Sequence, residues 1–176
     1  GKRRKEMSQN YWQWPETVYQ SKEIDWRKSK EIKAGVDLGT SGAQVAILCD
    51  GKIFAYGNIR VEADFKEAAR QVLDKALAGT GMKLADINAG IMATGWGAKN
   101  VEYATKTVDE ISAHAKGARF IYGKDVHTVV DLGGQTIKAI RLYDWDRVRD
   151  FAINDKCSTG MGRNMEVVCD MLQIPL

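Results

Sequence analysis

Cysteine and proline are scarce in this sequence, which has three cysteines and two prolines in 176 residues. Disulfide-stabilised secreted domains are short and dense in cysteine, so Cys49, Cys157 and Cys169 do not form a disulfide framework in a chain of this length. Their spacing also matches no zinc-binding pattern. We therefore expect a protein of the reducing cytoplasm, with one domain or two small lobes around a hydrophobic core.

Long hydrophobic runs are absent as well, because no stretch approaches the roughly 20 apolar residues that cross a membrane. The charged start GKRRKEM is followed by no apolar segment, so it does not match a signal peptide. Residues 1–33 contain nine Lys or Arg and five Asp or Glu, whereas the rest of the chain contains 17 and 18. The folded part is therefore close to neutral, and we expect neither a membrane nor a nucleic acid as a partner.

Residues 1–32 form a polar segment rich in aromatic residues, in which Pro15 opposes a continuous helix. Its aromatic residues are Tyr11, Trp12, Trp14, Tyr19 and Trp26. Two interpretations are open. The segment packs these side chains on the surface of its own domain, or it docks to another subunit, because Trp and Tyr are favoured interface anchors.

Hydrophobic periodicity predicts alternating strands and helices after residue 32. Strands, several of them running into glycine turns, are predicted within 32–42, 43–51, 52–61, 87–97, 126–136, 137–144 and 148–156. Helices are predicted within 64–79, 107–123 and 162–173. The Asp50-Gly51 pair between the second and third strands is a hairpin signal.

The sequence contains an internal duplication. The segment GVDLGTSGAQVAIL, residues 35–48, can be laid over VVDLGGQTIKAIRL, residues 129–142, so that each copy ends a strand with Asp-Leu-Gly. The overlay implies two β-β-β-α units about 94 residues apart. We therefore predict an α/β protein with an extension at 1–32, a first lobe at 33–124, and a second lobe at 125–176 that is cut short.

The two Asp-Leu-Gly turns have the composition of phosphate-binding loops, because glycines let backbone N–H groups approach an anion and hydroxyl groups add donors. The predicted phosphate-binding residues are Gly39, Thr40, Ser41, Gly42, Gly133 and Gly134. A carboxylate beside a phosphate is repulsive unless a cation intervenes, so Asp37 and Asp131 imply Mg²⁺, held through its water molecules. Two such turns facing each other clamp a polyphosphate, although either turn alone also fits an ordinary hairpin. Neither matches a P-loop or a GxGxxG that opens a helix.

The paired turns resemble the phosphate-1 and phosphate-2 motifs of the actin, Hsp70 and sugar-kinase ATPase superfamily. Four further stretches, ATGWGAKNV, EISAHAKGARFI, HTVVDLGGQTIKAI and NDKCSTGMGR, together resemble the BadF/BadG/BcrA/BcrD-type ATPases. This family comprises activators of 2-hydroxyacyl-CoA dehydratases and ATPase subunits of benzoyl-CoA reductase. The resemblance runs from about Lys33 to the last residue, and the stretches EIDWRK and ALAGTGM favour the benzoyl-CoA reductase type.

The resemblance implies RNase H-like lobes and an oxidoreductase subunit that hydrolyses ATP. It would drive low-potential electrons from a ferredoxin-like donor into a partner reductase or dehydratase. Cys157 would ligate a [4Fe–4S] cluster shared with a second ATPase subunit, identical or paralogous, with the other ligands supplied from beyond this chain and from that subunit. Gln135 is a candidate to position the attacking water. The sequence departs from the family at Gln44, where a lysine is common, and at Thr136, where an acidic residue is common.

Other candidate residues carry weaker signals. Cys49 lies in an apolar strand and Cys169 beside two valines of a helix, so both are predicted to be small core residues. His114 and His127 are each isolated, and a structural role is expected for both. Two other functions are open: a sugar or acetamidosugar kinase of the same superfamily, for which no catalytic base is evident, and an actin-like ATP-binding scaffold.

Overall fold

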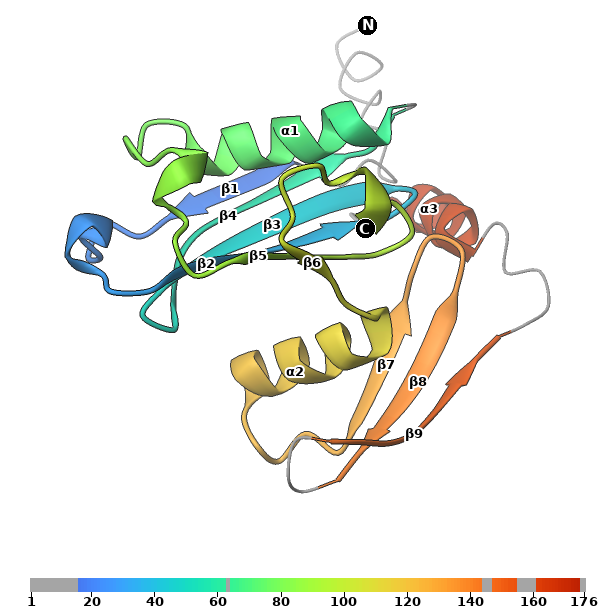
Figure 1. The fold of residues 1–176 in the computed structure, drawn as a ribbon. Helices are drawn as coiled ribbons and strands as arrows, with labels where there is room; N and C mark the ends of the chain where they lie inside the picture. The colour runs from blue at the N-terminus through green and yellow to red at the C-terminus, as the bar shows by residue number, and fades with distance from the viewer. Residues whose placement is uncertain (1–15, 63, 144–146, 155–160, 175–176) are drawn as a thin grey trace, which may run out of the picture.

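The structure, a computed structural model, describes residues 16–62, 64–143, 147–154 and 161–174 (Figure 1). These residues form two β-sheets. The first has the strand order β1-β4-β3-β2-β5-β6, with β1 (Thr17–Gln20), β2 (Ile32–Leu38), β3 (Gly42–Cys49), β4 (Lys52–Arg60), β5 (Ile91–Thr94) and β6 (Lys106–Thr107). The second has the order β7-β8-β9, with β7 (Thr128–Leu132), β8 (Ile137–Leu142) and β9 (Val148–Ile153). The helices are α1 (Phe65–Leu77), α2 (Glu110–Tyr122) and α3 (Met161–Leu172), with short 3-10 helices η1 (Trp26–Lys28), η2 (Leu84–Asp86) and η3 (Ala98–Asn100).

Every strand and helix predicted from periodicity is present, and the ends shift by a few residues. The antiparallel strands β2, β3 and β4 form a meander, and β5 joins β2 in parallel after α1 crosses over. The hairpin turn at Asp50 and Gly51 has positive φ at both residues, as the sequence pair predicts. The β-β-β-α unit of the first copy is therefore confirmed.

Side chains along β2 are alternately buried in the core and directed to the opposite face of the sheet. Ile32, Ala34, Val36 and Leu38 are buried on one face of the sheet. Asp37, at the intervening position, lies on the opposite face because successive side chains of a strand alternate. The sequence therefore delivers a carboxylate at the carboxyl end of β2, on the side away from the core.

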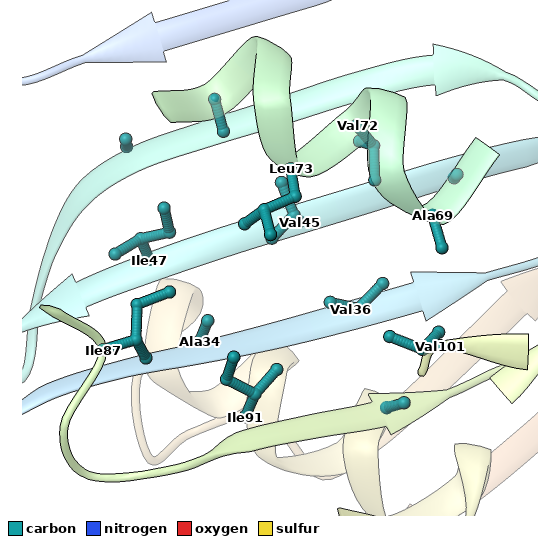
Figure 2. Packing of buried hydrophobic residues seen from close by; sticks show 14 of the residues in the cluster. Ala34, Val36, Val45, Ile47, Ala69, Val72, Leu73, Ile87, Ile91 and Val101 are labelled. Carbon is teal, nitrogen blue, oxygen red and sulfur yellow. The ribbon is translucent and has the colours of Figure 1, made fainter. Parts of the chain in front are cut away.

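The core of the first lobe lies between this sheet and α1 (Figure 2). Asp64 caps α1 by accepting hydrogen bonds from the backbone N–H groups of Lys66 and Glu67. The helix then buries one stripe against β3 and β4, made of Ala68, Ala69, Val72, Leu73 and Ala76. A Cβ atom on Gly57 would lie 3.0 Å from the carbonyl oxygen of Val72, so a glycine in β4 allows the helix to approach the sheet closely.

The described part of the 1–32 segment packs on the first lobe. Strand β1 pairs with β4 at the edge of the sheet, and the Tyr19 ring stacks on Tyr56 with ring centroids 5.2 Å apart. Trp26 packs against the core and donates a hydrogen bond from Nε1 to the Thr80 carbonyl oxygen. For Tyr19 and Trp26 this supports packing on the chain's own domain, whereas Tyr11, Trp12 and Trp14 lie outside the described residues.

Helix α2 packs on the second sheet, although the predicted lobe boundaries placed it in the first lobe, 33–124. It contacts β7, β8 and β9, and Ala115 shares a small buried core with Ile140 and Leu142. Arg119 is buried and donates hydrogen bonds to the carbonyl oxygens of Val126 and Tyr143. The chain thus crosses from one sheet to the other before α2, and α2 lies between the two sheets (Figure 1).

Cys49 on β3 and Cys169 on α3 are both buried, which confirms their prediction as core residues. Within the described residues, none of the helices is both long enough and apolar enough to cross a membrane.

Candidate functional site

The two Asp-Leu-Gly turns have the same backbone arrangement. Gly39 N–H donates to the Gly42 carbonyl oxygen at 2.9 Å, and Gly133 N–H donates to the Thr136 carbonyl oxygen at 2.8 Å. A Cβ atom on Gly39 or Gly133 would lie 3.2 or 3.1 Å from that same carbonyl oxygen, which is tighter than side chains normally tolerate. In both copies, glycine at the first turn position therefore lets the backbone lie close to the carbonyl oxygen three residues later.

The turns face each other across the space between the sheets. A Cβ atom on Gly134 would lie 2.5 Å from Ser41 Oγ and 3.3 Å from Thr40 Oγ1. The overlay of the two copies places Gly134 opposite Thr40 in sequence, so the first turn has a hydroxyl where the second has a bare backbone. Glycine at this position therefore lets the second turn lie directly against the Ser41 hydroxyl, which a larger residue would displace.

A cavity of about 420 Å³ lies between the turns. All nine residues predicted outside the cysteine site line it: Asp37, Gly39, Thr40, Ser41, Gly42, Asp131, Gly133, Gly134 and Gln135. The remaining lining residues are Gln44, Asn58, Trp96, Glu110, His114, Leu132, Thr136, Lys138 and Met165. Residues about 94 positions apart in the chain thus meet in one cavity, while their individual chemical roles stay predictions.

Asp131 is held by a buried lysine on the neighbouring strand. Its Oδ2 accepts a hydrogen bond from Lys138 Nζ at 2.8 Å, and the same ammonium group lies 2.8 Å from Glu110 Oε2 at the start of α2. The Lys138 side chain is only 6% exposed. Burial lowers the pKa of Lys138, but the hydrogen bonds to Asp131 and Glu110 outweigh burial, so the pKa lies above its ordinary value and the lysine stays charged.

His114 of α2 lies between the two turn aspartates. Its Nε2 is 3.6 Å from Asp37 Oδ2, and its Nδ1 is 3.5 Å from Asp131 Oδ2. Both distances are longer than a normal hydrogen bond. The approach of Asp37 raises the pKa of His114, burial opposes this rise, and the charge of Asp131 adds to it. Within the described part of the chain, Nδ1 is buried and has no hydrogen-bond partner.

Gln44 stands opposite Asp37 in the β2–β3 register, as Lys138 stands opposite Asp131 in the β7–β8 register. Its amide donates from Nε2 to Asn58 Oδ1 at 2.8 Å, so the side chain is held at the cavity wall by a neutral neighbour. The first turn therefore has no lysine in the position where Lys138 pairs with Asp131 in the second turn. Thr136, the other departure from the family pattern, accepts the turn hydrogen bond from Gly133 through its backbone.

Sequence reasoning assigned no functional role to several cavity residues, among them Trp96, Glu110, His114 and Lys138. For Lys138 a signal was available, because the overlay of the two copies aligns it with Gln44, at which a lysine is common in the family. For Trp96 the sequence offered a weaker signal, because a glycine stands on each side of it. In the structure, a Cβ atom on Gly95 would lie 2.4 Å from Asp37 Oδ1. This packing holds the Trp96 backbone beside Asp37, while its side chain is 74% exposed.

The cavity fits a magnesium–phosphate group better than a metal bound by protein alone. The described residues hold no group of three or more His, Cys, Asp or Glu arranged as a metal site. Mg²⁺ in nucleotide sites commonly keeps several waters and uses one or two carboxylates together with substrate phosphates. Asp37 and Asp131, flanked by the N–H groups and hydroxyls of the turns, supply such a set. Cys157, the predicted cluster ligand, lies outside the described residues.

Comparison with known proteins gives the relatives of this chain. It is 38% identical over 142 residues to the activator of lactoyl-CoA dehydratase of Anaerotignum propionicum, and the match covers 81% of this chain and 54% of the relative. It is 25% identical over 148 residues to one of the subunits of the benzoyl-CoA reductase of Thauera aromatica, covering 81% and 51%. The chain therefore spans about half the length of the curated relatives that it matches.

A solved structure shows the same architecture. The activator of the 2-hydroxyisocaproyl-CoA dehydratase from Clostridium difficile, with bound ADPNP, superimposes with a TM-score of 0.72 at 32% identity, over 81% of this chain and 53% of that chain. The predicted α/β fold of the actin, Hsp70 and sugar-kinase superfamily is thereby confirmed. The model of the BadF/BadG/BcrA/BcrD ATPase family matches residues 34–176, and the chain belongs to this family.

Proposed function

We propose that this protein hydrolyses ATP and uses the reaction to drive electron transfer into a dehydratase or reductase partner. One observation carries the ATPase part: two matched glycine turns, each led by an aspartate, face each other across a single cavity. Two anion-binding turns with two carboxylates suit a polyphosphate and its metal better than a neutral ligand. The family of the chain and the ADPNP bound to a structural relative support the same ligand.

Each cavity residue has a proposed part in nucleotide binding. The phosphates would be bound by the backbone and hydroxyl groups of Gly39, Thr40, Ser41 and Gly42 from one lobe and by Gly133 and Gly134 from the other. The carboxylates of Asp37 and Asp131 would hold Mg²⁺ through its waters, and the ion would neutralise phosphate charge. Gln135, in the second turn, would orient the attacking water. Closure of the cleft would exclude bulk water and strengthen these interactions.

The electron-transfer part rests on the relatives of the chain. Two named relatives are activators of dehydratases, and identity falls from 38% with a dehydratase activator to 25% with the benzoyl-CoA reductase relative. We therefore favour a dehydratase partner over the benzoyl-CoA reductase that EIDWRK and ALAGTGM favoured. Cys157 as ligand of a shared [4Fe–4S] cluster, a second ATPase subunit, a ferredoxin-like donor and a cytoplasmic location complete the proposal.

Anaerobic reconstitution of the full-length protein with iron and sulfide tests the proposal. We expect a brown protein with thiolate-to-iron charge-transfer absorption and Mg²⁺-dependent ATP hydrolysis. Cys157→Ser should be colourless and still hydrolyse ATP. Cys169→Ala, a change at a buried cysteine of α3, is the matched control and should remain brown.

Two other outcomes would replace the electron-transfer proposal. A colourless parent that phosphorylates an added sugar would identify a kinase. A colourless parent that binds ATP and assembles into filaments would identify a scaffold.

A further inference from the structure

His114 occupies a position that the proposed phosphate clamp does not explain. Its two ring nitrogens approach different carboxylates, Nε2 at 3.6 Å from Asp37 Oδ2 and Nδ1 at 3.5 Å from Asp131 Oδ2. These carboxylates come from the two copies of the duplicated unit. A single side chain therefore touches the equivalent residue of both lobes.

The two contacts differ in kind. Helix α2 packs on β7, β8 and β9, so His114 and Asp131 belong to one packed unit. Asp37 lies on β2 of the first sheet, so the contact of Nε2 with Asp37 crosses the cleft. Movement of the second sheet relative to the first would break the Asp37 contact and leave the Asp131 contact in place.

The ring of His114 lies among several charged groups. Asp37 and Asp131 face each other from opposite lobes, and two carboxylates in one site repel each other. Lys138 approaches the same oxygen of Asp131 as His114 does, and it also pairs with Glu110. Asp131 is thus anchored by its own lobe, and His114 is the described side chain that approaches both turn aspartates.

We propose that His114 is a positioning residue for the magnesium site: it joins Asp37 to Asp131 across the cleft and keeps both carboxylates aimed at the same metal–phosphate group. The proposal rests on the proposed ATP and Mg²⁺ binding. His114 would not touch the nucleotide. It would act through the two carboxylates, as residues behind metal ligands generally do.

Two amide substitutions separate the two contacts. In His114→Asn the amide nitrogen lies near the position of Nδ1, so the contact with Asp131 is retained and the contact across the cleft is lost. In His114→Gln the amide nitrogen lies near the position of Nε2, so the contact with Asp37 is retained. His114→Ala removes both, and His127→Asn, at the other histidine of the chain, is the matched control because this residue is exposed.

Calorimetric binding of ADPNP to the full-length protein, over a series of Mg²⁺ concentrations and in EDTA, measures the effect directly. Partners behind metal ligands typically contribute about 10- to 100-fold to metal affinity, so His114→Ala and His114→Asn should raise the half-saturating Mg²⁺ concentration about tenfold or more. His114→Gln should fall between these variants and the parent. Binding in EDTA, thermal melting and the His127→Asn control should stay unchanged.

Some outcomes would overturn the inference. If His114→Asn keeps the Mg²⁺ dependence of the parent while His114→Ala loses it, the contact across the cleft is not needed. If every His114 variant weakens binding equally with and without Mg²⁺, the residue is structural. If the parent shows no Mg²⁺-dependent binding of ADPNP, the proposed function itself is wrong. If the parent binds and every His114 variant binds equally well, only the role of His114 is wrong.

Discussion

The two Asp-Leu-Gly turns share a backbone but not their surroundings. In both, a glycine N–H closes the turn onto a carbonyl oxygen three residues on, at 2.9 and 2.8 Å. The first turn has the neutral pair Gln44 and Asn58 beside it, and the second has the buried Lys138 paired with the partly exposed Glu110. The two copies therefore share the backbone geometry of the turn, while the flanking side chains differ with the neighbours of each copy.

The copies also bury opposite faces. In the first, Leu38 and its alternate neighbours are buried beneath α1, and Asp37 faces the cleft. In the second, Ile140 and Leu142 of β8 pack against α2, on the same face as Asp131, and Leu132 is exposed. The equivalent leucines therefore have different environments among the described residues of this chain.

The largest expected difference between the copies is at these leucines. Leu38 is 0% exposed and Leu132 is 53% exposed. Leu38→Ala should lower the free energy of unfolding by about 3 kcal/mol, since it leaves a cavity in a packed core. Leu132→Ala should change it by less than about 0.5 kcal/mol. Urea denaturation of both variants of this chain measures the difference, and equal losses would contradict the comparison.

The next largest expected difference is in the stability effects of replacing Lys138 and Gln44, which occupy equivalent positions beside the two turns. Lys138→Met removes the partner of Asp131 and Glu110, and breaking a buried ion pair costs about 3–5 kcal/mol. Because the two acids are partly exposed, we expect about 2 kcal/mol. Gln44→Met, the matched change in the first copy, should cost less than about 1 kcal/mol. Urea denaturation measures this difference as a shift in the midpoint, provided that the dependence of the unfolding free energy on urea is unchanged. If Gln44→Met lowered the free energy of unfolding as much as Lys138→Met does, the two turns would not differ in this respect.

The contact between the turns predicts an effect on binding rather than stability. Gly134→Ala places a methyl group against Ser41 Oγ and should displace this hydroxyl from the cavity or push the turns apart. We expect roughly tenfold weaker ADPNP binding, which corresponds to about 1.4 kcal/mol. Gly117→Ala on α2 has open space around the added Cβ and should leave affinity unchanged, while adding about 0.5–1 kcal/mol of stability. Unchanged affinity in Gly134→Ala would show that the turns do not need to meet.

The smallest effect concerns the caps of the helices that cover the two sheets, Asp64 on α1 and Asp109 on α2. Replacing either with Ala should cost about 1 kcal/mol. The backbone N–H of Ser112 lowers the pKa of Asp109 from its ordinary value of 3.8. Its carboxylate therefore stabilises the fold fully above that value, and the contribution is lost as the pH falls through the lowered pKa. The difference in urea midpoint between Asp109→Ala and the parent should shrink below about pH 4; a constant difference would argue against a charged cap.

Local sequence signals predicted the first lobe well because its elements are amphipathic and strongly bounded. The Asp50-Gly51 pair predicted a hairpin, and the apolar stripe that includes Val72 and Leu73 predicted a helix. The edge strand β1 was missed, since Thr17–Gln20 is short and owes its conformation to pairing with β4. The placement of α2 was also missed, because helical periodicity shows that a face is apolar without showing which sheet covers it.

The sequence by itself determined the two turns, their glycines and their aspartates, because close backbone approach and a carboxylate at a strand end are local requirements. It determined the duplication, which indicated the superfamily, and four further stretches indicated the family. Only the tertiary structure decided that Gly134 meets Ser41, that Lys138 holds Asp131, and that His114 lies between the two aspartates. These contacts join residues far apart in the chain, and they depend on how two sheets and the helix between them pack, which no short stretch of sequence encodes.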